Sequence, residues 1–275
     1  MNGGKTSKSF LFPIAQPYSL ASASQPAITE AVSVASNTAT TIVRGQDTNT
    51  VQIFQETVEV SKAKQSTTGE IAGISVIGNQ PVKDEFDFQK NAQLRQIAID
   101  LDYSMLNGTY AAATDATTAA KMRGLANAIS TNAVAAAAAT LSKALVDEML
   151  RTMAASGAIF ENVVFVMNAF QKQKLSDIYG YAPENRNIGG VNIKQIETDF
   201  GMVGVMYDPH MATDDLYAVE MSVCSPVFVP VDGQLIQFED LAKVAASRKG
   251  QWYAQIGLDY GPEEYHGALT GLSTS

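Results

Sequence analysis

The sequence predicts an α+β fold, in which helices and strands are mixed without regular βαβ alternation. A long helical pattern from about residue 85 to 106 precedes a region of shorter elements. The chain from residue 191 to 260 then shows mainly apolar runs separated by turn residues, which is typical of strands. A chain of 275 residues is long for one domain and short for two. We therefore expect one discontinuous domain or two closely packed lobes.

Residues 1 to 37 predict an extended arm. This segment is rich in Ser, Ala, Thr and Pro, has few charged side chains, and shows no sustained helical or strand period. It nevertheless carries large apolar side chains, including Phe10 and Phe12, whose exposure to water is unfavourable. We expect these side chains to pack on another surface, and one of a neighbouring chain would serve.

A β-hairpin is predicted next. Residues 40 to 43 and 51 to 61 favour strands, and the segment from Gly45 to Asn49 between them favours a turn. Isolated hairpins are marginally stable in water, so we expect this one to lie on another surface.

The clearest helix spans about Glu85 to Leu106, with Asp84 as its N-cap and Asn107-Gly108 as its stop signal. Its apolar side chains fall on two nearly opposite faces, one containing Ile97 and the other Tyr103. A helix with two apolar stripes is expected to pack against other surfaces on both of these faces. Either it is buried in a single core, or one stripe faces a second lobe or another subunit.

Shorter elements are predicted along the rest of the chain. Helices are expected at residues 117 to 129, 141 to 155, 169 to 178 and 238 to 246, and strands at 162 to 167, 191 to 196, 202 to 207, 216 to 221, 227 to 231 and 251 to 260. Residues 179 to 190 have the composition of a loop.

Composition and charge exclude several classes of protein. The chain has 19 basic and 28 acidic residues and a net charge of −9, which disfavours nucleic-acid binding through phosphate neutralisation. The single Cys224 excludes an internal disulfide and a cysteine-rich metal cage. Charged residues make up only 17% of the chain, which suggests that partners cover part of the surface. No stretch is long and apolar enough for a membrane helix, so we expect no membrane partner.

Only two histidines could act as a general base, His210 and His266. Asp208 lies close to the first in sequence and Glu263 lies close to the second, but neither spacing aligns a base with an orienting acid. A zinc site would need both imidazoles together with carboxylates. We therefore expect no catalytic residue, no cofactor and no metal site, and keep a soluble hydrolase using His210 or His266 as a minor alternative.

Several segments resemble major capsid proteins of tailed bacteriophages that have the Hong Kong 97-like fold. An arm, a hairpin, a long helix and a mixed α/β body occur here in the order found in that family. Residues 49 to 61 resemble the strand that leaves the extended loop in one group of these proteins. Other similar segments are residues 121 to 125, 197 to 201, 241 to 243 and 265 to 272.

The resemblance implies a division of the chain into five parts. These are an N-terminal arm (1–37), an extended loop (38–65), a linker and spine helix of a peripheral domain (66–112), a mainly axial domain (113–249), and a strand that returns to the peripheral domain with the C-terminal end (250–275). The candidate contacts between subunits are then Phe10, Phe12, Ile42, Val43, Ile53 and Phe54.

The resemblance also implies a function. The chain would be a structural major capsid protein that self-assembles, as hexamers and pentamers, into an icosahedral or elongated head around the phage genome. It would enclose double-stranded DNA without reading its sequence, in the virion and, during assembly, in the host cytoplasm. Portal, scaffolding and decoration proteins would be further partners. The main alternative is another self-assembling protein, such as an encapsulin-like shell or a tail component.

Overall fold

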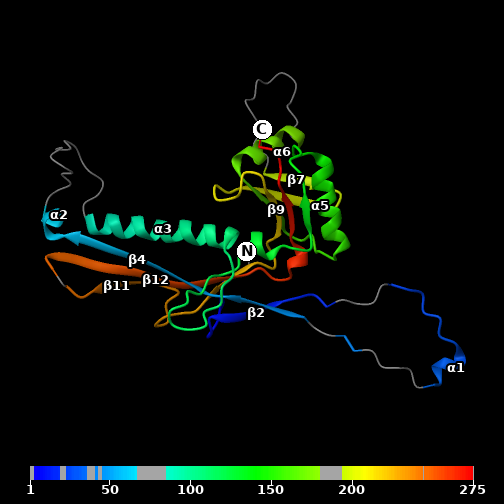
Figure 1. Cartoon of the computed structure of the whole chain (residues 1–275), viewed down its shortest axis with the longest axis horizontal. Helices are drawn as coiled ribbons and strands as arrows, with labels where there is room; N and C mark the ends of the chain where they lie inside the picture. The colour runs from blue at the N-terminus through cyan, green and yellow to red at the C-terminus, as the bar shows by residue number, and fades with distance from the viewer. Residues whose placement is uncertain are drawn as a thin grey trace.

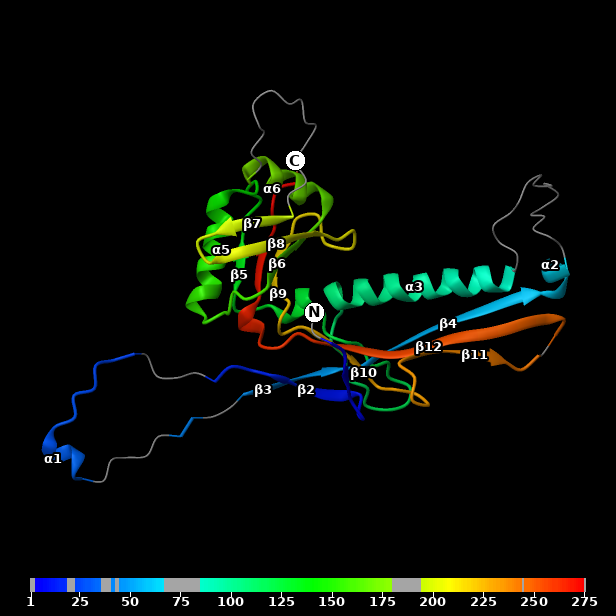
Figure 2. The ribbon, with the colours of Figure 1, turned by 180° about the vertical axis from the view of Figure 1, so that it is seen from behind.

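The structure is a computed structural model that describes residues 3–18, 23–35, 41–42, 45–66, 85–179, 194–243 and 245–274. It contains two units built on separate sheets (Figure 1). The spine layer consists of the long helix α3 (Glu85–Asn107) on a five-stranded sheet. The compact unit is a six-stranded sheet with two helices, and it stands on one end of the spine layer (Figure 2).

The spine layer is organised around one long strand, β12 (Ser247–Asp259). Along one edge β12 pairs with β4 (Gln52–Ser61), and along the other it pairs with β10 (Ser225–Phe228) and β11 (Ile236–Leu241). The short strand β1 (Lys5–Thr6) extends the sheet beside β10, and α2 (Lys62–Ser66) follows β4. Buried and exposed residues alternate along β4, as expected for a strand with one face on a core.

Helix α3 confirms the predicted long helix, although its expected N-cap, Asp84, lies outside the described residues. Ile97 is buried in the same apolar cluster as Phe54, while Tyr103 is 55% exposed. One apolar stripe therefore faces the sheet, and the other faces away from the subunit's own core. The backbone at Gly124 passes close to the end of the helix. A Cβ atom on Gly124 would lie 2.6 Å from the Gly108 backbone nitrogen, so only glycine fits at this position.

The compact unit contains the second sheet, in the order β5-β13-β9-β6-β8-β7. Its strands are β5 (Ala133–Ala135), β6 (Val163–Met167), β7 (Gln195–Thr198), β8 (Gly201–Tyr207), β9 (Leu216–Glu220) and β13 (Gly267–Thr270). Helix α5 (Lys143–Ala155) packs against β13, and α6 (Ala169–Tyr179) follows β6. The continuous apolar run of β6 suits its position between two paired neighbours. The predicted strands of this unit are confirmed within a few residues, except that residues 191–193 lie outside the described part of the chain.

Two predicted helices are wrong. In place of a helix over residues 117 to 129, the Asp115 carboxylate accepts hydrogen bonds from the Thr117 and Thr118 nitrogens in a turn, and only α4 (Leu125–Ala128) is helical. Residues 238 to 246 contain no helix in their described part, because β11 pairs residue by residue with β12. There Phe238 packs edge-on against Trp252, with 5.0 Å between ring centroids, so strand packing overrides local helix propensity.

The predicted hairpin is also wrong. Strand β3 (Gln46–Thr50) pairs with β2 (Leu11–Ala15), and β4 pairs with β12, whereas Thr41 and Ile42 belong to no strand. The predicted arm therefore contains a strand of the folded subunit, and Phe12 is buried in its core. The sequence of β2 shows no period-two pattern, because all five residues are apolar and Pro13 lies at its centre. A proline is tolerated there because β2 pairs along one edge only.

The division into arm, extended loop, peripheral domain and axial domain stays a prediction, and the sheets can only be set beside its boundaries. Strands β10 and β11 lie in the sheet of the spine layer, although residues 113 to 249 were expected to be mainly axial. The strand expected to return at residues 250 to 260 is β12 of the spine layer, and the C-terminal strand β13 pairs with β9 in the compact unit. No helix within the described residues is long and apolar enough to cross a membrane.

A buried polar cluster joins the two units at His266, in the segment between the short 3-10 helix η1 (Glu263–Tyr265) and β13. The His266 Nδ1 atom accepts a hydrogen bond from the Glu220 nitrogen at 3.1 Å, and Nε2 lies 2.6 Å from the Tyr260 carbonyl oxygen. A neutral imidazole with its proton on Nε2 satisfies both contacts. Burial lowers the pKa of His266 below its ordinary value of 6.5.

We predict that His266 makes folding stability fall in mild acid. Below pH 6.5 the unfolded chain takes up a proton that the folded chain does not bind, so this contribution is complete above that pH and is lost as the pH falls through the folded pKa. The slope for one site is at most about 1.4 kcal/mol per pH unit. Urea unfolding of unassembled subunits at pH 7.5 and 5.5 should show a smaller pH effect in His266→Gln than in the wild type. An equal pH effect in both proteins would contradict this role.

Candidate assembly site

The described residues between β2 and β3 (16–18, 23–35, 41–42 and 45) project away from both units, and we call them the projecting loop (Figures 1 and 2). All residues from 23 to 35 are exposed, including the single helical turn α1 (Glu30–Ser33). The loop nevertheless carries apolar side chains that would ordinarily be buried. Those most exposed are Tyr18, Ile28, Val32, Val34 and Ile42, with Val34 at 83%. Apolar side chains that are exposed to solvent in this way indicate a contact surface rather than a folded core.

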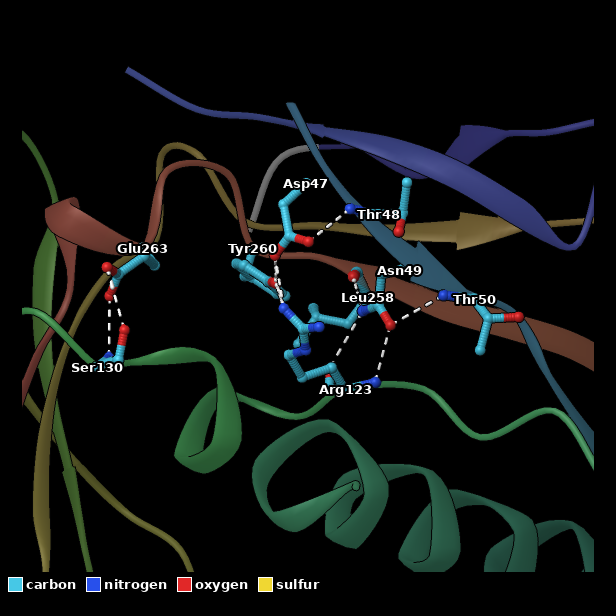
Figure 3. A network of polar contacts seen from close by, with 9 residues as sticks. All are labelled: Asp47, Thr48, Asn49, Thr50, Arg123, Ser130, Leu258, Tyr260 and Glu263. Atoms are coloured by element: carbon cyan, nitrogen blue, oxygen red, sulfur yellow. Dashed lines mark hydrogen bonds and ion pairs between the residues drawn. The ribbon is translucent and has the colours of Figure 1, made fainter. Parts of the chain in front are cut away.

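Below the loop, β3 is fixed to the spine layer by the buried side chain of Asn49 (Figure 3). Its Nδ2 atom donates hydrogen bonds to the carbonyl oxygens of Leu258 at 2.8 Å and Arg123 at 3.1 Å. Its Oδ1 atom accepts from the nitrogens of Thr50 at 2.9 Å and Arg123 at 2.8 Å. Every hydrogen-bonding position on the donor nitrogen and two on the acceptor oxygen are thus used, and one side chain links three separate backbone segments.

An ion pair reinforces this attachment. The Arg123 Nη1 atom lies 2.5 Å from the Asp47 carboxylate, and the Tyr260 hydroxyl donates to the same carboxylate at 3.1 Å. Burial raises the pKa of Tyr260 to about 12, although the Arg123 guanidinium opposes the shift, so the hydroxyl stays protonated and able to donate. The guanidinium also lies over the Tyr110 ring, 4.9 Å from its centroid. We call Asp47, Asn49, Arg123 and Tyr260 the loop root.

A groove runs between β4 and α3 in the spine layer, with a volume of about 350 Å³. Its walls combine apolar and polar side chains, and Ile53 and Tyr103 are about half exposed there, at 46% and 55%. The lining residues are Gln52, Ile53, Phe54, Gln55, Glu56, Ile97, Asp100, Tyr103 and Ser104. The outward apolar stripe of α3 therefore borders a concave surface.

The structure separates the six predicted contact residues. Ile42 and Ile53 are exposed, at 53% and 46%, on the projecting loop and in the groove. Phe12 and Phe54 are only 6% and 5% exposed and pack in the subunit's own core, so neither offers appreciable area to a neighbour. Phe10 is partly buried against the same core. Val43 lies outside the described residues.

Sequence reasoning missed the loop root. Asp47 and Asn49 read as turn residues because Asp and Asn favour turns, and nothing near them indicated strand pairing with residues 11 to 15. The first strand carried no alternation of apolar and polar residues that could have indicated it, because Leu11–Ala15 is apolar throughout and contains a proline.

Of the two sequence-neighbour pairs considered above for a hydrolase, Glu263 does not contact the His266 ring, whereas Asp208 Oδ1 does lie 3.7 Å from His210 Nδ1. Glu263 accepts hydrogen bonds from the nitrogens of Ser130 and Thr131 (Figure 3 shows Ser130), while both ring nitrogens of His266 contact backbone atoms. Cys224 is buried, which raises its pKa to about 12 and keeps the thiol protonated.

Comparison with solved structures places this arrangement among capsid and encapsulin folds. The chain is similar to a subunit of the cyanophage A-1(L) capsid, with a TM-score of 0.68 and 12% identity over 98% of this chain and 90% of that chain. The capsid of a native GTA particle gives a TM-score of 0.62 at 12% identity, over 98% and 88% of the two chains. The SrpI encapsulin of Synechococcus elongatus PCC 7942 gives 0.60 at 8% identity, over 98% and 86%.

No curated protein matches the sequence significantly. The family model of the SU10 major capsid protein, however, matches residues 1–273, which is nearly the whole chain. That match agrees with the mixed α/β fold, the sequence resemblance and the capsid folds of the structural neighbours. The chain therefore belongs to the SU10 major capsid protein family and is a shell-forming structural protein of a phage capsid.

Proposed function

We propose that the subunits join into hexamers and pentamers by laying each projecting loop on a neighbouring subunit. One observation carries the proposal: an apolar loop without its own core is fixed at its base by the loop root. A free loop of this composition would lose much conformational entropy on binding. Rigid attachment of β3 limits that loss and directs the loop outward.

We propose that the groove between β4 and α3 of a neighbouring subunit receives the projecting loop. Within one subunit, the β2–β3 ribbon runs in the opposite direction to α3 (Figure 2), so a loop does not reach the groove of its own chain. Contacts from one subunit's loop to the next subunit's groove are heterologous, and such contacts close into rings when the rotation between subunits allows it. Burial of apolar side chains such as Ile42 then stabilises each contact.

In this arrangement the compact unit would be the axial domain, close to the centre of each ring, and the spine layer would be the peripheral domain. The net charge of −9 suits a wall that encloses double-stranded DNA and does not bind it tightly. We propose that the shell encloses the genome in this way and that subunits assemble in the host cytoplasm. Portal, scaffolding and decoration proteins are the further partners expected of such a shell.

We predict that a charge on the loop blocks assembly without unfolding the subunit. The Ile42→Asp variant would place an unpaired carboxylate in the contact, whereas Ile42→Val keeps the position apolar. Circular dichroism should show folded protein in both variants. Electron microscopy should show closed shells for Ile42→Val and the wild type, and at least tenfold fewer for Ile42→Asp.

The same pair of substitutions at Ile53 tests the receiving groove. Normal shell yield from both aspartate variants would contradict the proposed contact. Absence of shells from the wild type under all assembly conditions would instead count against self-assembly of the chain by itself.

We also predict that the shell contains no covalent links between subunits. An isopeptide bond needs a lysine delivered to a neighbour's asparagine. The sequence has no lysine between residues 9 and 61, and Lys62 and Lys64 lie in α2, at the far end of the spine layer from the projecting loop (Figure 1). Boiling mature particles in detergent and reductant should release a single 29.3 kDa band. A ladder of multimers would show that covalent chemistry does occur.

A further inference from the structure

The joint between the spine layer and the compact unit contains a cluster of three metal-ligating side chains that sequence spacing does not show. Asp102 comes from the last third of α3, while Asp208 and His210 come from the segment that follows β8. The His210 Nδ1 atom lies 2.6 Å from the Asp102 Oδ2 atom and 3.7 Å from the Asp208 Oδ1 atom. One ligand atom from each residue lies within 4.8 Å of the others.

The cluster is held in place from several sides. The Asp208 nitrogen donates to the Met167 carbonyl oxygen at the end of β6, and the His210 nitrogen donates to Asp208 Oδ1 at 2.8 Å. The Asn107 Nδ2 atom donates to the His210 carbonyl oxygen at 3.0 Å, which ties this segment to the end of α3. The edge-on Tyr103 ring packs against the imidazole, with 6.3 Å between centroids.

The charges in this cluster are unbalanced. Asp208 is only 6% exposed, and the two carboxylates of Asp102 and Asp208 lie beside a single imidazole. Burial raises the pKa of Asp208, and the nearby Asp102 carboxylate adds to the shift. A dication between the three side chains would offset this repulsion. One imidazole nitrogen and two carboxylate oxygens form a ligand set that suits Zn²⁺ and similar divalent transition metals.

We propose that Asp102, Asp208 and His210 bind one divalent transition-metal ion per subunit, which braces α3 against the compact unit. The ion takes the place of the hydrogen bond between His210 Nδ1 and Asp102, the proton of that bond is released to solvent, and water completes the coordination. Asp102 is about half exposed on its helix, so its carboxylate has room to rotate toward the ion. The brace would fix the angle between the two units and so favour one subunit shape.

Titration of chelator-treated full-length protein with Zn²⁺ alone tests the site. Calorimetry should show one saturable ion per subunit, and the ion should raise the melting temperature. Asp102→Asn and His210→Gln should each weaken binding at least tenfold and remove the thermal shift. Asp87→Asn is the matched control, because it removes an exposed carboxylate from the other end of the same helix. Substitution with Co²⁺ should give a visible absorption spectrum in the wild type and the control only.

Three results would overturn the proposal. The first is the absence of saturable binding at millimolar Zn²⁺. The second is equal binding by the wild type and both cluster variants, which would indicate a different site. The third is a melting temperature that responds to pH through His210 but not to the ion, which would show that a proton alone occupies the cluster.

Discussion

The architecture depends on the hydrogen bonds of one buried side chain, Asn49. Its amide joins β3 to the carbonyl oxygen of Leu258 in β12 and to the backbone of Arg123, which lies in the segment that crosses the end of α3. Loss of one such buried partner costs about 1–3 kcal/mol, so replacement of this side chain would leave several costly unpaired groups. The ion pair between Asp47 and Arg123 adds a second connection beside it. The projecting loop can therefore be exposed and apolar while its base remains part of the core.

This arrangement explains why the subunit is suited to assembly in a shell rather than to existence as an isolated chain. The projecting loop and the outward stripe of α3 both keep apolar side chains in water, and each offers area that a second copy could cover. A closed shell repeats such a contact many times. Many weak contacts held at fixed geometry give a stable assembly without covalent links.

Short sequence patterns predicted the helices whose apolar spacing and end signals lie within one short segment. Helix α3 and helix α5 were recognisable from their apolar spacing and from the stop signals after them, and the structure adds Ser142 as the N-cap of α5. Strand partners were not recognisable. Residues 11 to 15 pair with residues 46 to 50 across the whole projecting loop, and a sequence read in short windows favours a nearby partner instead.

The same limit applies to the functional groups. Glu263 and His266 are close in sequence, yet the buried partner of His266 is the Glu220 backbone, and the carboxylate nearest His210 Nδ1 belongs to Asp102 on α3. Ile42 and Ile53 are exposed, and their place in contacts between subunits stays a prediction. Phe12 and Phe54 pack in the subunit's own core, on strands whose partners lie far away in the sequence, and no partner chain tests their predicted place in contacts.

Hydrogen–deuterium exchange, compared between unassembled subunits and purified shells, tests the central claim most directly. Amides of Thr48 to Thr50 in β3 should exchange slowly in both states, because the loop root belongs to the folded subunit. Amides of residues 23 to 35 should exchange rapidly in the subunit and become protected only in the shell. A projecting loop already protected in the isolated subunit, or still unprotected in the shell, would contradict the account.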